Sequence, residues 1–322
     1  MSISHSGKPS LSRPKKRYKY LKLTGSNTYT GPTVINSIRV EPCTSSAFGS
    51  GEVHVGGGER AGGRVYFGTP VTLGNDFFVS GRGINKSVYS ETSGAFVFAA
   101  DATLTGDVTL EGETRMALVS SARGTLSGSV KGGGFLSLYP GSGTLVLSGE
   151  NTYTGGTEVV SATLAVTRTG SLGSGEVVLD NGTLAFENTT AISLTNTVSG
   201  VGTVALKGSA PVTFRCEKSS LTAALDLCGT EQTFTEMPPF GTITNSLPKK
   251  ATIALAANLG TVDWPEVELG GRISLAVGEG TVLDLGGRTV DVFRLEIDTA
   301  SRVVNGTVNE ERPIGGMSII VK

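Results

Sequence analysis

The side chains best suited to catalysis are few in this chain and lie far apart in the sequence. Of the two histidines, His5 is near the N-terminus and His54 lies in the strand-like run 52–55. No Gly-x-Ser-x-Gly nucleophile elbow accompanies either histidine, no Cys/His spacing suggests zinc, and no Gly-x-x-x-x-Gly-Lys-Ser/Thr loop is present to hold phosphate. We therefore predict no catalytic residue, no metal site, no cofactor and no enzyme activity.

Acidic residues give the strongest enzymatic alternative. Asp101, Asp107, Glu111 and Glu113 form the densest local group of carboxylates in the chain. A β-helical polysaccharide lyase or hydrolase would need such a cluster on one face, often with calcium or a basic residue. The other acids are scattered, so solvated turn carboxylates explain the group better. The alternative functions are a polysaccharide-active enzyme and a glycan-binding module.

The three cysteines, Cys43, Cys216 and Cys228, do not form an even set that would indicate a disulfide framework. Cys216 and Cys228 could pair, but their spacing does not establish the geometry of a disulfide. In the segment 225–229, Cys228 occupies the position that Gly286 holds in the similar segment 283–287. This favours a small residue at a tight turn over a catalytic thiol.

The elements that would position any site come from internal repeats. Residues 21–55 align without a gap with residues 145–179, and 15 of the 35 aligned positions are identical. Leu225–Gly229 and Leu283–Gly287 form a second pair, 58 residues apart. Self-similarity of this kind is typical of solenoids and other repeat architectures.

Between these landmarks the sequence alternates between short apolar patterns and turns. Leu145 with Leu147 and Leu184 with Phe186 are among the i, i+2 pairs that indicate strands. Only 251–259 suggests a helical turn. A sandwich would also suit many short strands, but the long-offset repeats and low aromatic content favour an all-β, right-handed parallel β-helix (β-solenoid). With roughly 20 residues per coil, it would have about 15 coils.

The repeated Asn-Thr-Tyr-Thr-Gly segment suits a corner between strands. Asparagine hydrogen-bonds its own backbone and accepts left-handed conformations, while glycine permits tight reversals. The two tyrosines could stack on a ligand, but packing is the better interpretation of residues inside a structural motif. The predicted structural motif comprises Asn27, Tyr29, Gly31, Asn151, Tyr153, Gly155 and Gly156.

Residues 149–166 closely resemble the autotransporter-associated β-strand repeat, also called the passenger-associated transport repeat. Residues 25–40 match with Pro32 in place of the second glycine, and 172–175 and 283–287 also look like the family. The resemblance implies a non-catalytic passenger segment of an exported bacterial surface protein that supports transport, display or adhesion. It implies a secreted or outer-membrane-associated location and a parent protein with a membrane anchor or barrel.

Composition and charge set the remaining expectations. The chain has 322 residues, 46 of them glycine, and a net charge of −1. Eight basic residues precede the first acid, Glu41, so residues 41–322 carry −9. We predict a disordered basic tail over 1–18 with no nucleic-acid partner, a β-helix over 19–208 and its continuation over 209–322. No signal-peptide h-region and no transmembrane run is evident, and the expected partners are host or cell-surface glycans or proteins.

Trp264 stands in the segment Asp263–Glu266, where Pro265 interrupts the strand pattern. It marks either an exposed contact or the cap of a coil, and the sequence does not decide between them.

Overall fold

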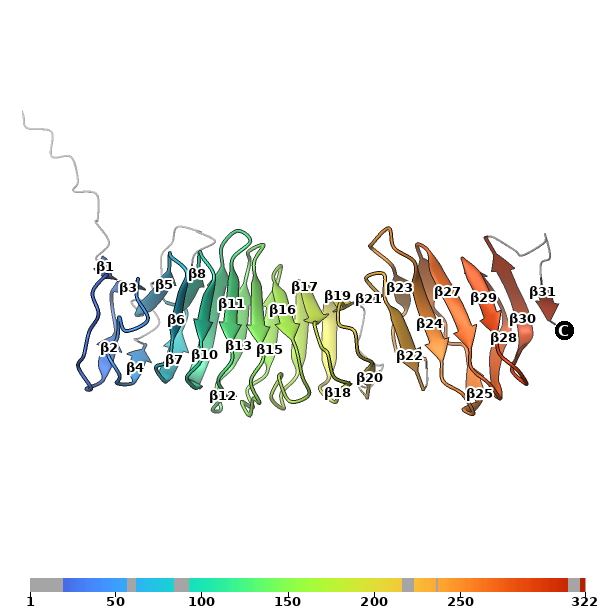
Figure 1. Cartoon of the computed structure of the whole chain (residues 1–322), viewed down its shortest axis with the longest axis horizontal. Coiled ribbons are helices and arrows are strands. Elements are labelled where there is room, and N and C mark those ends of the chain that lie inside the picture. Colours follow the sequence, from blue (N-terminus) through green and yellow to red (C-terminus); the bar gives the residue numbers. More distant parts are fainter. Residues whose placement is uncertain are drawn as a thin grey trace, which may run out of the picture.

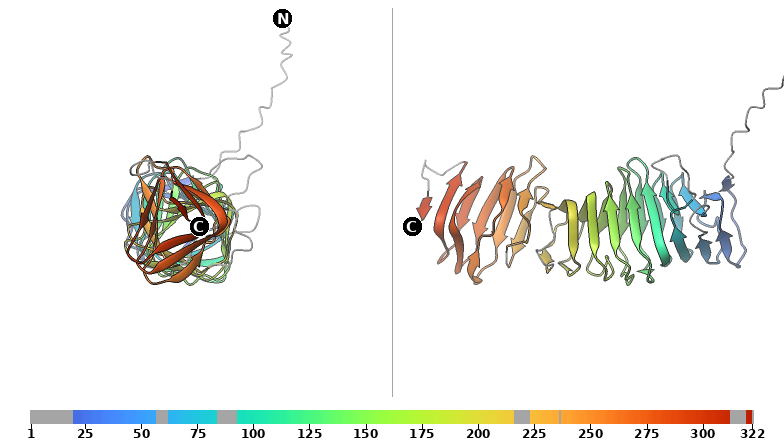
Figure 2. Two further views of the ribbon diagram at one scale, coloured as in Figure 1. Left: turned by 90° about the vertical axis from the view of Figure 1, so that its right-hand side faces the viewer. Right: turned by 180° about the vertical axis from the view of Figure 1, so that it is seen from behind.

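The computed structural model describes residues 20–56, 62–83, 93–215, 223–235, 237–311 and 319–321. These residues form an elongated all-β rod in which the chain winds through about 13 turns of a parallel β-solenoid (Figure 1). Viewed end-on, down its long axis, in the left view of Figure 2, the rod has a rounded triangular outline, with one column of strands on each side. The predicted all-β parallel β-helix is confirmed.

Column 1 runs along most of the N-terminal two thirds of the rod. Its strands are β1 (Tyr20–Leu23), β3 (Arg39–Pro42), β5 (Arg64–Phe67), β8 (Phe96–Phe98), the second half of β10 (Val108–Leu118), β13 (Leu136–Tyr139), β15 (Thr157–Val160), and the first halves of β17 (Val177–Phe186) and β19 (Val198–Leu206).

Column 2 lies on the next side of the N-terminal part. Its strands are β2 (Thr33–Ile35), β4 (Val53–Val55), β7 (Phe77–Gly81), the first half of β10, and β12 (Val130–Lys131). Column 3 continues farther toward the C-terminus. Its strands are β6 (Val71–Leu73), β9 (Ala102–Leu104), β11 (Arg123–Leu126), β14 (Thr144–Leu147), β16 (Thr163–Val166), the second halves of β17 and β19, β21 (Ala224–Asp226), β23 (Thr242–Thr244) and β26 (Glu268–Gly270).

The remaining strands complete the C-terminal coils in three smaller sheets. One sheet pairs β18 (Ile192–Leu194) with β20 (Val212–Phe214); the second contains β22 (Glu231–Phe234), β24 (Ala251–Leu255), β27 (Ile273–Val277) and β29 (Arg294–Ile297); the third contains β25 (Gly260–Asp263), β28 (Thr281–Val292), β30 (Arg302–Glu310) and β31 (Ile319–Val321). Among the described strands every pairing is parallel except that of β30 with β31, which is antiparallel. The helical turn predicted over 251–259 is wrong, because β24 pairs with β22 and β27 as a strand.

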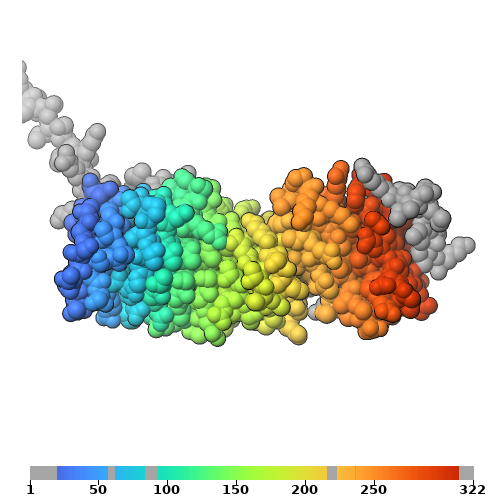
Figure 3. All heavy atoms as spheres, in the orientation of Figure 1, coloured from blue at the N-terminus to red at the C-terminus, as the bar shows by residue number. Residues whose placement is uncertain are grey.

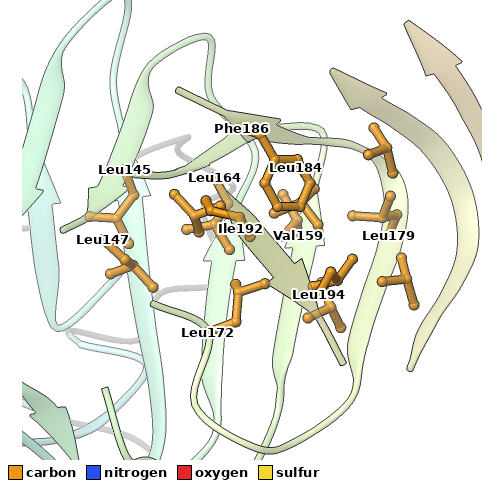
Figure 4. Close-up of a cluster of buried hydrophobic side chains, with 14 of the residues drawn as sticks. Leu145, Leu147, Val159, Leu164, Leu172, Leu179, Leu184, Phe186, Ile192 and Leu194 are labelled. Atoms are coloured by element: carbon orange, nitrogen blue, oxygen red, sulfur yellow. The ribbon is translucent and has the colours of Figure 1, made fainter. Parts of the chain in front are cut away.

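The core is a set of ladders in which equivalent residues of successive coils stack along the rod axis. The alternating pairs identified in the sequence lie in one such ladder, in which Leu145 stacks on Leu164 and Leu164 on Leu184. All three side chains are buried. Figure 4 shows these leucines meeting Val159 and Ile192 from the other two sides of the triangle. The narrow interior accounts for the modest apolar content of the chain.

Coil lengths are unequal in the N-terminal part. From β1 to β3 the register advances by 19 residues, from Arg39 to Arg64 by 25, and from Val65 to Phe96 by 31. Longer coils reduce the number of turns below the predicted 15 or so. The coils continue past residue 208 because β19 pairs with β21, and Figure 3 shows a waist near this junction, where yellow meets orange.

Candidate functional site: the stacked Asn–Tyr–Gly corners

The predicted motif residues form corners in which adjacent coils are joined by side chains. In the second copy, Asn151 accepts a hydrogen bond from the Val130 N–H of the preceding coil at 2.7 Å. Its amide nitrogen donates to the Ser171 carbonyl of the following coil at 2.6 Å. A single buried side chain therefore ties three consecutive coils together. In the first copy, Asn27 donates to the Ala47 carbonyl at 2.7 Å.

Tyrosine is the core residue of the corner. The Tyr153 hydroxyl lies 2.7 Å from the Thr157 hydroxyl, and the side chain is 0% exposed. Burial raises the pKa of Tyr153 to about 12, although the hydrogen bond to Thr157 acts in the opposite direction. Tyr29 makes the same contact with Thr33 at 2.7 Å, but it is 42% exposed because it lies in the first described coil. Tyr153 is thus a packing residue of the motif, whereas the ring of Tyr29 stays partly exposed.

Glycines of the following coil close over the tyrosines. Gly49 and Gly173 have φ values of +60°, and a Cβ atom at either position would lie 2.1 or 2.2 Å from the carbonyl oxygen of Tyr29 or Tyr153. Their left-handed backbone and the close contact both require glycine. The Leu-Gly-Ser-Gly segment after the motif is therefore the second layer of the same corner.

A third layer was not found in the sequence. Asn75 donates to the carbonyls of Gly49 and Gly51 at 3.2 and 2.8 Å. Asn196 makes the equivalent bonds to Gly173 and Gly175 at 3.2 and 2.8 Å. Each asparagine lies two residues after a leucine and two before an apolar strand residue. This Leu-x-Asn-x-apolar pattern is the signal that could have identified the third layer.

Within the motif, two glycines are constrained in different ways. Gly156 has a φ of +89°, which favours glycine. Gly155 has an ordinary φ, but a Cβ atom there would lie 2.3 Å from the Gly134 carbonyl oxygen. In contrast, a Cβ at Gly31 would meet no heavy atom within 4 Å.

The two copies of the corner lie on different sides of the rod. In the first copy the motif leads into β2, which belongs to column 2. In the second copy it leads into β15, which pairs with β13 and β17 in column 1. Five complete coils and one further side of the triangle separate the copies, so the repeat is rotated by one column about the axis.

The acidic group is divided between turn positions and strand β10, and three of its four members have structural partners. Asp101 accepts the Arg123 N–H at 2.8 Å. Asp107 accepts the Ser129 N–H at 3.0 Å and pairs with Lys131 at 2.8 Å. The hydrogen bond from Lys131 and that from Ser129 lower the pKa of Asp107, whereas a general acid requires a raised pKa. Glu113 pairs with Arg82 at 2.8 Å, and Glu111 is exposed.

The second repeat pair forms matching turns. Asp226 accepts the Cys228 N–H at 2.9 Å, and Asp284 accepts the Gly286 N–H at 2.8 Å. Cys228 and Gly286 both have positive φ, +47° and +59°. Burial, followed by the charge of Asp226, raises the pKa of the Cys228 thiol to about 11. The thiol is therefore protonated at neutral pH, as expected of a turn residue.

The other candidate residues are structural or lie outside the described chain. His54 stacks on Phe78 with ring centroids 4.8 Å apart and contacts Glu52 at 2.8 Å. Trp264, whose role the sequence left open, is 2% exposed and belongs to the core. His5, Cys216 and the predicted tail lie outside the described residues, so the Cys216–Cys228 pairing stays a possibility raised by the sequence alone. The described residues contain no group of three metal-ligating side chains.

Comparison with known proteins identifies the same corners. The model of the passenger-associated-transport-repeat family matches residues 20–37 and 141–166, which confirms the resemblance found in the sequence. A relative, the adhesin BmaC autotransporter of Brucella suis biovar 1 (strain 1330), is 48% identical over 67 residues. The match covers 19% of this chain and 2% of the relative, so the chain corresponds to a small part of that protein's length. No solved structure gives a significant match.

The described part of the chain contains no helix that is long and apolar enough to cross a membrane.

Proposed function

We propose that this chain is a non-catalytic scaffold segment of a surface-displayed passenger protein, in which the stacked corners hold a rod that supports transport, display or adhesion. The observation that carries the proposal is the use of the motif side chains. Asn151 and Tyr153 are buried, and the hydrogen bonds of Asn151 join neighbouring coils. The conspicuous residues of the repeat therefore build the rod and leave its outer faces available for partners.

Family and relative support the same role. Two segments match a repeat that is named for transport of passengers, and the similar Brucella protein is named as an adhesin autotransporter. The hydrogen-bonded turn carboxylates favour this role over polysaccharide cleavage, because Asp101 and Asp107 bind backbone N–H groups of the next coil. A solenoid of this kind offers long, regular faces for binding.

The location can be tested with an antibody against the folded chain and proteinase K treatment of intact cells of the organism that encodes it. We expect the antibody to label intact cells, and the protease to remove that label. If the chain were detected only after lysis, the surface assignment would be wrong. Release of sugar ends from a polysaccharide panel by the purified chain would instead support the enzyme alternative.

A further inference from the structure

Column 1 gathers positive charge and tyrosine on its outer side. The register aligns Tyr20 with Arg39 and Arg39 with Arg64. Farther along the same column, Arg115 of β10 lies beside Tyr139 of β13. The neighbouring outward positions add three more residues. We refer to the whole set as the cationic stripe, consisting of Tyr20, Lys22, Arg39, Glu41, Arg64, Tyr66, Arg115 and Tyr139. These residues lie on β1, β3, β5, the second half of β10 and β13, which are labelled in Figure 1, while β8, between β5 and β10 in the column, contributes none.

Two guanidinium groups of the stripe rest on tyrosine rings. The Arg39 Cζ lies 3.4 Å from the ring centroid of Tyr66 and 5.8 Å from that of Tyr20. The Arg115 Cζ lies 4.0 Å from the ring centroid of Tyr139. Stacking of this kind holds the plane of the guanidinium while its N–H groups stay directed outward from its edge. The arginines are therefore oriented before any ligand arrives.

Carboxylates neutralise only part of the positive charge of the stripe. Glu41, which is 3% exposed, pairs with Lys22 at 2.9 Å and with Arg39 at 3.2 Å. Arg64 donates its Nε–H to the Gly94 carbonyl at 3.1 Å. Within the described ranges, neither Arg64 nor Arg115 forms an ion pair. Glu158 lies two strands beyond Arg115 in the same column, so the four cations have two nearby carboxylates on this side, Glu41 and Glu158.

Burial and neighbouring cations destabilise the charged forms of the arginines in the stripe. Burial, followed by the charge of Arg39, lowers the pKa of Arg64 to about 10. Burial and the charge of Arg82 also lower the pKa of Arg115. The Nε atoms of Arg39 and Arg115 are buried without a hydrogen-bond partner in the described structure. With a pKa of about 10, Arg64 remains protonated at neutral pH. An anion placed along the stripe would relieve the repulsion between these guanidinium groups.

A polar depression lies at the N-terminal end of the stripe. Its volume is about 350 Å³, and its lining includes Tyr20, Lys22, Arg39, Tyr66 and the carboxylate of Glu41, which is paired with Lys22 and Arg39. This volume lies within the range of small-ligand sites. Tyr20, 61% exposed, offers an apolar ring at the rim, and the Lys22 ammonium is beside it.

We propose that the cationic stripe binds an acidic polysaccharide through its carboxylate or sulfate groups. Planar guanidinium edges match such oxyanions. Arg39 and Arg64 present them from adjacent coils, and Arg115 does so two coils farther along the same column. The observations disfavour single-stranded nucleic acid, because it needs a series of open aromatic faces for successive bases. Tyr20 is exposed, but the faces of Tyr66 and Tyr139 are covered by arginine. This binding goes beyond the scaffold role and does not depend on where the protein is located.

Binding of the purified full chain to immobilised polymers tests the proposal. Dextran sulfate and polygalacturonate separate sulfate from carboxylate ligands, and neutral dextran is the control. We expect binding to at least one polyanion and none to dextran. Arg64→Gln and Arg115→Gln should each raise the apparent Kd by about threefold to tenfold, while Arg302→Gln, an exposed charge at the far end of the rod, should leave it unchanged.

The charge-conserving variants Arg64→Lys and Arg115→Lys provide the second set. They should bind more weakly than the wild type and better than the glutamine variants, because lysine keeps the charge and loses the planar fork. Thermal unfolding of each variant verifies that the rod is intact. The proposal is overturned by absence of binding to both polyanions, by equal weakening in Arg302→Gln, or by tighter binding of single-stranded DNA. Surface display, which is measured separately on cells, is unaffected by any of these results.

Discussion

Replacing Tyr153 by alanine removes a side chain that is 0% exposed and is hydrogen-bonded to Thr157 at 2.7 Å. Truncation of a fully buried aromatic residue costs about 3–5 kcal/mol of unfolding free energy. The Thr157 hydroxyl, also buried, would lose its partner, which adds roughly 1 kcal/mol. We therefore expect a loss near the upper end of this range, about 5 kcal/mol.

Tyr29→Ala is the matched control, because Tyr29 occupies the same position of the same motif and makes the same contact with Thr33. Its side chain is 42% exposed, so little more than half of the burial is lost on truncation. The expected cost is about 2 kcal/mol. The two variants should therefore differ by about 3 kcal/mol, although the local sequences are nearly identical.

Urea unfolding followed by circular dichroism measures both costs, and limited proteolysis locates the segment that opens first. In Tyr153→Ala the first cuts should fall near the second corner. If the two alanine variants lost the same stability, or if Tyr153→Ala cost less than about 1 kcal/mol, the assignment of Tyr153 as the core of the corner would be refuted.

Three further outcomes are expected. Gly173→Ala should lower the free energy of unfolding by more than about 2 kcal/mol, because Gly173 has a positive φ and a Cβ atom there would lie 2.2 Å from the Tyr153 carbonyl oxygen. Its control is Gly133→Ala, which has open space around its Cβ and should leave the thermal unfolding close to unchanged. Cys228→Gly should be neutral or stabilising by up to about 1 kcal/mol in urea unfolding, because Cys228 has a positive φ; a clear loss would contradict a turn role. The pKa of Tyr153 is about 12 in the folded state against 10 in the unfolded state. Its contribution to the free energy of unfolding is therefore complete below pH 10 and is lost as the pH rises toward 12. In a pH series, the stability of Tyr153→Phe should fall less steeply at alkaline pH than that of the wild type, and identical declines in stability would argue against the shift.

Much of the rod follows from local sequence pattern. The pairs Leu145 with Leu147 and Leu184 with Phe186 lie inside the core, as period-two alternation predicts. The Asn-Thr-Tyr-Thr-Gly corner was recognisable because it is repeated with few changes. Its chemistry was also predictable, since asparagine and glycine suit tight turns.

What the sequence did not reveal depends on coil length. Arg39, Arg64 and Arg115 lie on one side only because the register advances by unequal steps, which include 25 and 31 residues. No fixed spacing marks these arginines as neighbours. Burial of Trp264 was equally hidden, because Pro265 interrupts the pattern that would have placed it in the core.

The one-column rotation between the two corners has a consequence for multivalent recognition. A flat, rigid partner that bound the outer surface of one corner could not reach the equivalent surface of the other, because the two face different sides of the rod. Its two binding arms would then act independently, with no gain from effective concentration. A flexible partner whose linker follows the circumference could engage both copies. Duplication of the corner thus allows partners to approach equivalent surfaces from two sides of the rod. It does not raise the number of equivalent binding surfaces on any single side.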